Sequence, residues 1–168
     1  MEKYLGLDYE LTQLEVQKLA YFLQEAGEPL KLKYSKHLYG PYADNLNKVL
    51  ELLDGHYIHG YSGDRGPNVP LTLHSGAQKE ADTFLSEEGN GAVKRLERVS
   101  ELITGFETPY GMELLSSVHW VSTKEQPAAQ NADEAVSAIM DWSSRKQKLM
   151  KPEHIRLAYN HLKKAGWM

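Results

Sequence analysis

Histidines, serines and carboxylates are the residues in this sequence whose chemistry could support catalysis or metal binding. His56 and His59 are three apart, a spacing that points to opposite faces of a strand, and no third metal ligand follows at a characteristic spacing. Two serines next to His119 share its helical turn, which does not bring a nucleophile, a base and an orienting group together. Four glutamates lie close together in the sequence, Glu97, Glu101, Glu107 and Glu113, and we expect them to be solvent-exposed residues on helix faces and not an acid–base pair. We therefore expect no catalytic residue, no metal and no cofactor.

Tyrosines and tryptophans favour a binding function over an enzymatic one. The 168 residues include 10 tyrosines and 3 tryptophans. These side chains combine a large contact area with a polar tip and are enriched at binding hot spots. Four of the tyrosines lie near expected turns, where exposure is more plausible than in the middle of a helix: Tyr34, Tyr39, Tyr42 and Tyr110.

Charge is distributed unevenly along the chain. The formal net charge is -4, which argues against a generic nucleic-acid binder because such proteins normally carry a basic surplus. Residues 1–144 contribute -10 and residues 145–168 contribute +6. The basic end either contacts a partner or anchors against the acidic remainder. Its cations are Arg145, Lys146, Lys148, Lys151, Arg156, Lys163 and Lys164.

Length and composition indicate a globular protein with a real core. The chain has no cysteine, which excludes disulfides and Cys-bound zinc and fits a reducing compartment. No apolar run approaches the roughly 18 residues that a membrane-spanning helix needs. We expect a cytoplasmic protein with no membrane contact.

Hydrophobic periodicity predicts seven helices, over about 13–26, 43–53, 76–88, 92–104, 108–122, 132–144 and 153–165. Thr12 and Glu15 have the spacing of a capping box, and Thr108-Pro109 has the residue types of an N-cap followed by a first helical residue. Alternating patterns predict strands over 30–34, 56–59 and 69–73, the last an edge strand because it contains Pro70. The expected fold class is α+β, predominantly helical, with six to seven helices and a small antiparallel sheet.

The expected domain organisation is a core domain over 1–124 and a surface connection over 125–131. A C-terminal helical pair over 132–168 would pack on the same domain.

Three segments resemble the C-terminal domain of the DarG antitoxins. They are LEVQKLAYFLQEAG at 14–27, YGPYADNL at 39–46 and GFETPYGMELL at 105–115. The likeness is strong over about residues 1–125 and continues less distinctively to the end. The first two segments also resemble, more loosely, the Panacea-type antitoxin domains.

The resemblance implies an isolated, monomeric domain that binds a DarT-type toxin, an enzyme that ADP-ribosylates thymidine in single-stranded DNA. In DarG an N-terminal macrodomain removes ADP-ribose from DNA, and the sequence here lacks the Gly-rich loops of that fold. We therefore expect an antitoxin domain that is not itself an enzyme and occupies the DNA groove of the toxin by mimicking DNA, with no direct nucleic-acid contact. The alternatives are a nucleic-acid-binding module using the basic end and, less favoured, a nucleotide hydrolase.

Site residues follow from the same three segments. The expected partner-binding residues are Tyr39, Tyr42, Glu107, Tyr110 and Glu113. The turns that present them would be shaped by Gly40, Pro41, Thr108 and Pro109. Lys18, Tyr21 and Gln24 belong to the same segments, with packing as the alternative role.

Overall fold

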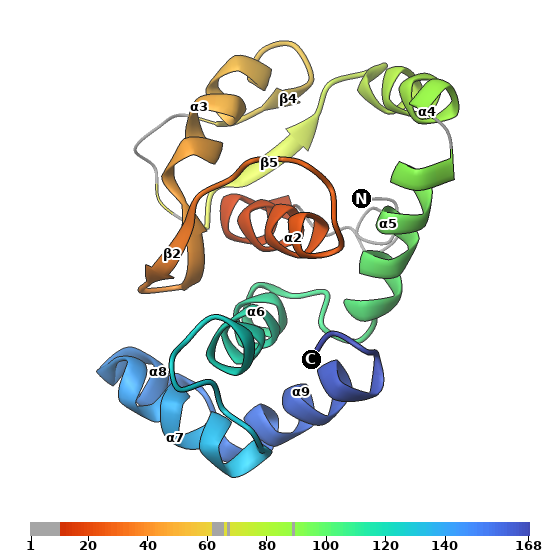
Figure 1. Ribbon diagram of the computed structural model, residues 1–168. Helices are drawn as coiled ribbons and strands as arrows, with labels where there is room; N and C mark the ends of the chain where they lie inside the picture. The colour runs from red at the N-terminus through yellow and green to blue at the C-terminus, as the bar shows by residue number, and fades with distance from the viewer. Residues whose placement is uncertain (1–10, 62–65, 67, 89) are drawn as a thin grey trace. The chain divides into compact units, whose positions relative to one another are not determined.

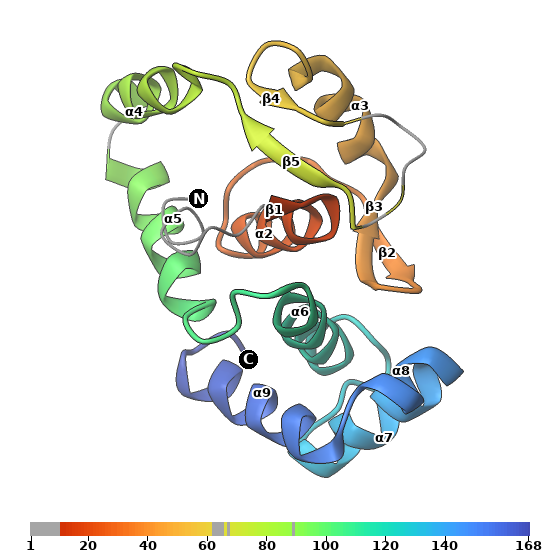
Figure 2. The same ribbon diagram turned by 180° about the vertical axis from the view of Figure 1, so that it is seen from behind.

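The computed structural model describes residues 11–168 except 62–65, 67 and 89. Helices dominate, accompanied by short antiparallel strands, which confirms the α+β, predominantly helical class (Figures 1 and 2). The helices are α2 (Gln13–Glu25), α3 (Asp44–Leu53), α4 (Ala77–Glu88), α5 (Asn90–Leu102), α6 (Pro109–Thr123), α7 (Ala132–Trp142), α8 (Ser144–Leu149) and α9 (Pro152–Lys164). The strands are β1 (Leu11–Thr12), β2 (Tyr34–His37), β3 (Gly40–Ala43), β4 (Ile58–His59) and β5 (Pro70–Leu73).

Helix starts follow the predicted caps. The Thr12 hydroxyl accepts a hydrogen bond from the Glu15 amide while the Glu15 carboxylate accepts one from the Thr12 amide, so the capping box of α2 is complete. Thr108 caps α6 by accepting from the Gly111 amide at 3.0 Å, and Pro109 is the first helical residue. The predicted helix over 132–144 is wrong at its end, because Ser143 is extended and begins a separate helix, α8.

Two of the strand predictions are corrected. Residues 30–33 form no strand, because Lys31 has a φ of 56° and side chains take the backbone groups that a neighbouring strand would need. The Gln24 amide donates to the Leu32 carbonyl at 3.0 Å and accepts from the Leu32 amide at 2.6 Å. Pro70 does not mark an edge strand: β5 lies between β1 and β4, and Pro70 is tolerated there as the first residue of its strand.

The predicted break at residues 39–42 becomes a strand. Leu38 and Tyr39 form a two-residue turn, and Gly40 to Ala43 then pair with β2 as β3. Gly40 has a φ of 93°, which a residue without Cβ adopts easily on leaving the turn. Pro41 is compatible with this position because a two-stranded sheet leaves one side of each strand unpaired.

The chain groups into two compact units. Unit 1 comprises residues 1–34 and 43–101, and unit 2 comprises residues 35–42 and 102–168. This grouping does not test the domain boundaries expected from the sequence, which stay predictions.

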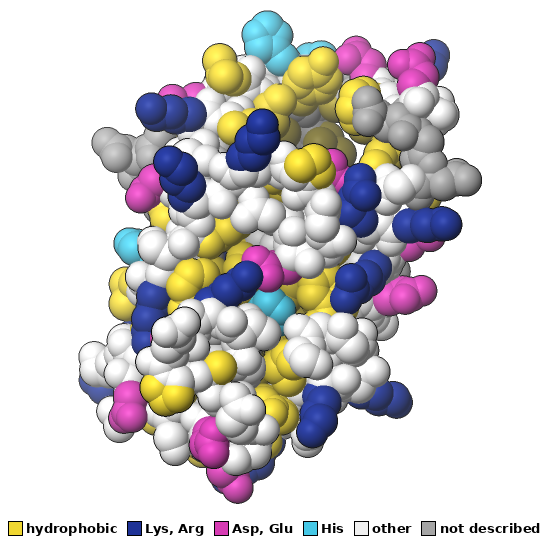
Figure 3. Space-filling model, in the orientation of Figure 1, with side chains coloured by type: hydrophobic (Ala, Val, Ile, Leu, Met, Phe, Trp, Pro, Cys, Tyr) yellow, Lys and Arg dark blue, Asp and Glu magenta, His cyan; other side chains and the backbone are white. Residues whose placement is uncertain are grey.

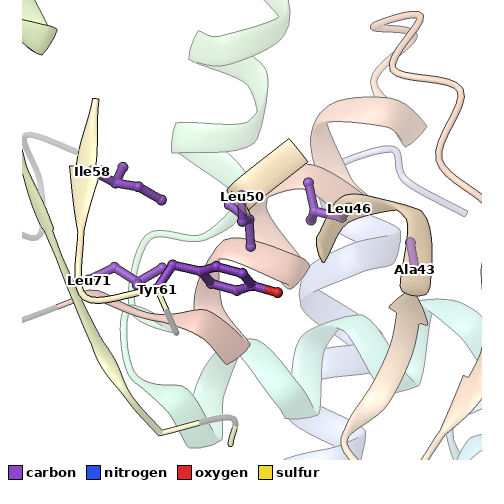
Figure 4. Close-up of a cluster of buried hydrophobic side chains, with 6 residues drawn as sticks. All are labelled: Ala43, Leu46, Leu50, Ile58, Tyr61 and Leu71. Atoms are coloured by element: carbon purple, nitrogen blue, oxygen red, sulfur yellow. The ribbon is translucent and has the colours of Figure 1, made fainter. Parts of the chain in front are cut away.

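Unit 1 has a hydrophobic core beside its three-stranded sheet. Leu11 pairs with Leu71 across β1 and β5, and Ile58 pairs with Leu73 across β4 and β5. Figure 4 shows the buried cluster that covers this sheet, with Leu50 of α3 pointing toward the sheet residues. Its members are Ala43, Leu46, Leu50, Ile58, Tyr61 and Leu71.

Among its described residues, unit 1 also has an apolar groove of about 1280 Å³. Residues of α2, α3, α4, α5 and all three strands of the sheet line it, among them Leu50, Leu53 and Phe84. Figure 3 shows hydrophobic side chains exposed around a hollow in the part of the molecule where α3, β4 and α4 lie in Figure 1. Phe84 is 57% exposed, so the apolar surface of this unit is only partly covered.

Unit 2 is a helical assembly joined by the tip of the β2–β3 hairpin. The α6 helix packs against α7 and α9, and α7 packs against both α8 and α9. Residues 111–119 of α6 are all buried, so α6 is the central helix of the unit. No helix among the described residues is long and apolar enough to cross a membrane, and the expected cytoplasmic location stays a prediction.

Candidate functional site: cations and aromatic rings around Glu113

The α6 helix places Glu113 inside unit 2. Thr108 and Pro109 fix the start of the helix, and Gly111 allows it to pass close to the preceding chain, since a Cβ on Gly111 would lie 2.5 Å from the Phe106 carbonyl oxygen. One turn after the cap, Glu113 is 2% exposed. A carboxylate this deeply buried needs charged partners.

Two consecutive residues of α8 provide these partners. Arg145 Nη1 donates to Glu113 Oε1 at 2.6 Å, and Lys146 Nζ donates to the same oxygen at 2.8 Å. Lys146 Nζ also donates to the Ser117 hydroxyl at 2.9 Å, one turn further along α6. The Ser143 hydroxyl accepts from the Lys146 amide and so fixes where α8 begins.

Lys146 is fully buried, and its protonation depends on this arrangement. Burial lowers the pKa of the Lys146 ammonium, while the Glu113 carboxylate acts in the opposite direction. The two cations differ in exposure, because the Arg145 side chain is 33% exposed. Glu113 therefore holds one cation in the interior and one at the surface.

Aromatic rings lie against these cations. The Arg145 guanidinium is 4.4 Å from the centre of the Tyr39 ring, and Lys146 Nζ is 4.8 Å from that of Trp142. The exposed Lys36 places its ammonium 4.6 Å from the same Trp142 ring. Such cation–π contacts favour a cation that keeps a fixed position beside a ring.

The hairpin residues are tied to α7 and to the connection after α6. Trp142 Nε1 donates to the His37 carbonyl oxygen at 3.0 Å. Lys36 forms an ion pair with Glu125 at 2.5 Å, and the His37 and Tyr42 rings are 5.1 Å apart. The tip of the hairpin is thus held to the helices of unit 2 by several contacts.

A second pair of polar side chains joins α6 to α9. The Tyr110 hydroxyl is 2.8 Å from His154 Nδ1, and both side chains are partly buried. Burial raises the pKa of the Tyr110 phenol, although a hydrogen bond from the Lys151 backbone acts against this. The pair can pass a proton between a phenol and an imidazole.

The structure brings together only part of the expected partner-binding set. Tyr39 and Glu113 meet through Arg145, whereas Tyr110 bonds to His154 and the Glu107 carboxylate accepts from the Gly105 amide at 2.6 Å. The expectation that Glu113 lies on an exposed acidic surface is wrong, because it is buried among cations. A role in partner binding stays a prediction for the whole set: Tyr39, Tyr42, Glu107, Tyr110 and Glu113.

The turn-shaping residues and the residues shared with the first family segment lie in regular structure. Thr108 and Pro109 begin α6 as predicted, and Gly40 and Pro41 are buried in β3. Lys18 and Tyr21 of α2 are buried, the Tyr21 ring meeting that of Tyr34 edge-on at 5.0 Å. Gln24 binds the Leu32 backbone, and a functional role for Lys18, Tyr21 and Gln24 stays a prediction.

Sequence reasoning did not single out Trp142 or the buried state of Lys146, and it considered Ser117 only as a nucleophile, a role that it rejected. Lys146 and Glu113 are 33 positions apart, and no spacing rule connects them. The one available signal was the expectation that the basic end anchors on acidic residues. This is what Arg145 and Lys146 do at Glu113, and Arg156 does the same at Asp133 at 2.8 Å.

The curated proteins to which this chain is similar carry the name of an enzyme. No family model matches the chain. A curated protein of Thermus aquaticus named DNA ADP-ribosyl glycohydrolase is 42% identical over 163 residues, which cover 97% of this chain and 44% of that protein. Proteins of the same name from Mycobacterium bovis and Mycobacterium tuberculosis are 30% identical over 157 residues, 90% of this chain. The chain spans less than half the length of these curated relatives.

These names correct the functional expectation. The chain is homologous to part of proteins named as hydrolases, which contradicts the expectation of an antitoxin domain that is not an enzyme. The link to ADP-ribosylation is supported by the same names. The nucleotide hydrolase, the least favoured alternative from the sequence, is the one to which the relatives point.

Proposed function

We propose that this chain is part of an enzyme that hydrolyses the bond between ADP-ribose and DNA. The observation that carries the proposal is the 42% identity to a DNA ADP-ribosyl glycohydrolase over 97% of the chain. A match of this extent takes in both units, so it does not depend on a single motif.

Hydrolysis of a glycosyl bond needs a group that moves a proton and groups that hold the substrate. In unit 2, Tyr110 and His154 are hydrogen-bonded and partly exposed, which supports a role for this pair in proton transfer. Glu113 is unsuited to that role because two cations already neutralise it. Arg145 and Lys36, whose ion-paired side chains are 33% and 41% exposed and lie beside aromatic rings, support substrate binding.

The test measures release of ADP-ribose from an ADP-ribosylated DNA oligonucleotide by chromatography. One arm uses this chain, and the other uses the Thermus aquaticus relative with and without the segment that aligns with this chain. We expect either release by the chain or a loss of about tenfold or more when the segment is deleted. An inactive chain together with a deletion that leaves the relative fully active would refute the proposal.

Within the chain, Tyr110→Phe and His154→Gln address the proton-transfer role. If the chain releases ADP-ribose, each variant should lower kcat by about a hundredfold, since general acid–base groups contribute at least that much. His56→Gln is the matched control, because His56 is an exposed histidine outside unit 2.

The partner expected from the resemblance, a DarT-type protein, stays a prediction, as does the likeness to the C-terminal domain of DarG in particular. Co-purification of this chain with such a protein tests both without reference to the hydrolytic activity.

A further inference from the structure

Two histidines from neighbouring strands of unit 1 lie side by side on its three-stranded sheet. The ring centres of His59 and His74 are 5.0 Å apart, and the angle between the ring planes is 48°. His59 is the last residue of β4, and His74 directly follows β5. Sequence spacing offered His56 as the companion of His59, whereas the structure places a histidine from the next strand beside it.

The pairing of β4 with β5 explains why these side chains meet. His59 lies opposite Thr72, and the His74 amide donates to the Tyr57 carbonyl oxygen at 2.8 Å, so the pairing continues beyond the last residue of β5. Thr72 and His74 are two positions apart, which places them on the same face of the sheet, opposite to the buried Leu71. His59 and His74 are therefore diagonal neighbours on one face, close enough for their rings to reach each other.

Both rings are accessible to a ligand from solvent. His59 is exposed and His74 is half-buried. His74 Nδ1 is 2.9 Å from the Ser75 carbonyl oxygen, which can only accept a hydrogen bond. In the neutral ring, Nδ1 therefore carries the hydrogen and Nε2 keeps its lone pair. Histidines that bind metal ions commonly donate their second ring N–H to a backbone carbonyl in this way, which orients the ring.

The distance between the rings suits a shared metal ion. A histidine nitrogen lies about 2.0–2.1 Å from zinc, so two imidazoles on one tetrahedral ion have ring centres about 5 Å apart. In the part of the chain that the structure describes, no group of three or more His, Asp or Glu residues could hold a metal ion. The two imidazoles would thus be the only protein ligands among these residues, with water in the remaining coordination positions.

We infer that His59 and His74 together bind a divalent transition-metal ion of the class that favours imidazole ligands, which comprises Zn²⁺, Ni²⁺ and Cu²⁺. The ion links β4 to β5 and stabilises the sheet of unit 1, because a ligand that binds only the folded state adds to its stability. The inference is independent of the proposed function, in which neither histidine takes part.

Calorimetric titration of the metal-free chain with zinc chloride, in a preparation without a histidine tag, tests the inference. We expect one ion per chain with a Kd of about 100 µM or lower, weakened about tenfold or more by His59→Gln and by His74→Gln. His56→Gln is the matched control, since it removes an exposed histidine three positions before His59, and it should change the affinity less than about twofold. The inference is overturned by an absence of saturable binding up to about 1 mM zinc, or by equal weakening in the control.

Hydrogen exchange shows whether one ion joins the two strands. Zinc at about ten times its Kd should slow exchange of the β4 and β5 amides by about tenfold in the wild-type chain and leave it unchanged in His74→Gln. Equal exchange rates of the two proteins without zinc would show that the variant keeps the fold. Slowing that persists in His74→Gln, or that is missing from the wild-type chain, would contradict a shared ion.

Discussion

Units 1 and 2 bury polar groups in different ways. In unit 1 the Gln17 side-chain amide donates to the Ala43 carbonyl and accepts from the Ala43 amide, both at 3.1 Å, so a neutral side chain satisfies neutral backbone groups. In unit 2 the buried Lys146 is satisfied by the Glu113 carboxylate. Unit 1 also buries Glu15 and Lys18, and its hydrophobic core borders an open groove. The Glu113–Lys146 pair makes unit 2 sensitive to loss of charge, and the hydrophobic cluster around Leu50 makes unit 1 sensitive to loss of side-chain volume.

Removing one partner of the buried ion pair is expected to have the largest effect. Glu113→Leu leaves the Lys146 ammonium buried without its counter-ion, which should lower the free energy of unfolding of unit 2 by about 3–5 kcal/mol. All three tryptophans of the sequence, Trp120, Trp142 and Trp167, lie in unit 2, so urea unfolding followed by tryptophan fluorescence reports on that unit.

The control is the double variant Glu113→Leu with Lys146→Met. It removes both charges and should recover most of the lost stability, because apolar replacements of a buried ion pair are often close to neutral. A double variant as unstable as the single one would mean that the pair does not act as a unit.

Acidification should destabilise unit 2 through His119. Burial lowers the pKa of this histidine from 6.5 to about 4. Between these values the unfolded chain binds the proton and the folded chain does not, so stability falls as the pH falls from 6.5 to 4. The shift corresponds to a loss of about 3 kcal/mol over that range.

Urea unfolding at several pH values measures this dependence. The His119→Gln variant should lose most of the roughly 3 kcal/mol dependence between pH 6.5 and 4. The His37→Gln variant, which changes an exposed histidine, should keep that dependence. An unchanged pH dependence in His119→Gln would assign the effect to other groups.

Leu50→Ala tests the hydrophobic core of unit 1. Leu50 is 3% exposed and also lines the groove, so the cost should be about 2–3 kcal/mol, the lower part of the range for core leucines. Leu52→Ala is the matched control on the same helix, where the side chain is 77% exposed and the effect should stay below about 0.5 kcal/mol. Hydrogen exchange of peptides covering residues 44–53 reports on this unit directly.

The smallest expected difference is between the helix caps of the two units. Thr108→Ala removes one hydrogen bond at the exposed start of α6 and should cost about 1 kcal/mol. Thr12→Ala also deprives the buried Glu15 carboxylate of the Thr12 hydroxyl, and should cost about 2 kcal/mol. Thermal unfolding of both variants compares them, and equal losses would contradict the idea that burial of Glu15 matters.

Glu15 adds a pH signature to that comparison. Burial raises the pKa of its carboxyl above 4.5, so the folded state holds this proton at pH values where the unfolded state has lost it. Stability contributed by Glu15 therefore falls as the pH rises above 4.5, the opposite direction to His119. Glu15→Gln should remove this slope, as followed by hydrogen exchange in α2.

Local rules account for most of the helices. The Thr12 capping box, the Thr108-Pro109 start and the helical spacing of apolar residues involve neighbours within a few positions, and the structure follows them. The strands were harder, because β5 pairs with residues about 60 positions away in β1 and 13 to 15 positions away in β4. The positive φ of Lys31 could not be predicted either, because no residue near it in the sequence indicates a turn there.

By itself, the sequence determined the fold class, the starts of most of the helices and the segregation of positive charge near the C-terminus, since each depends on composition or short spacing. Tertiary structure alone decided that Glu113 is buried, that Lys146 and Arg145 both donate to Glu113 Oε1, and that Tyr39 lies against Arg145. These contacts join residues 32, 33 and 106 positions apart. The physical reason is that desolvation and cation–π contact depend on what surrounds a side chain in space, and that is fixed only when the helices of unit 2 pack together.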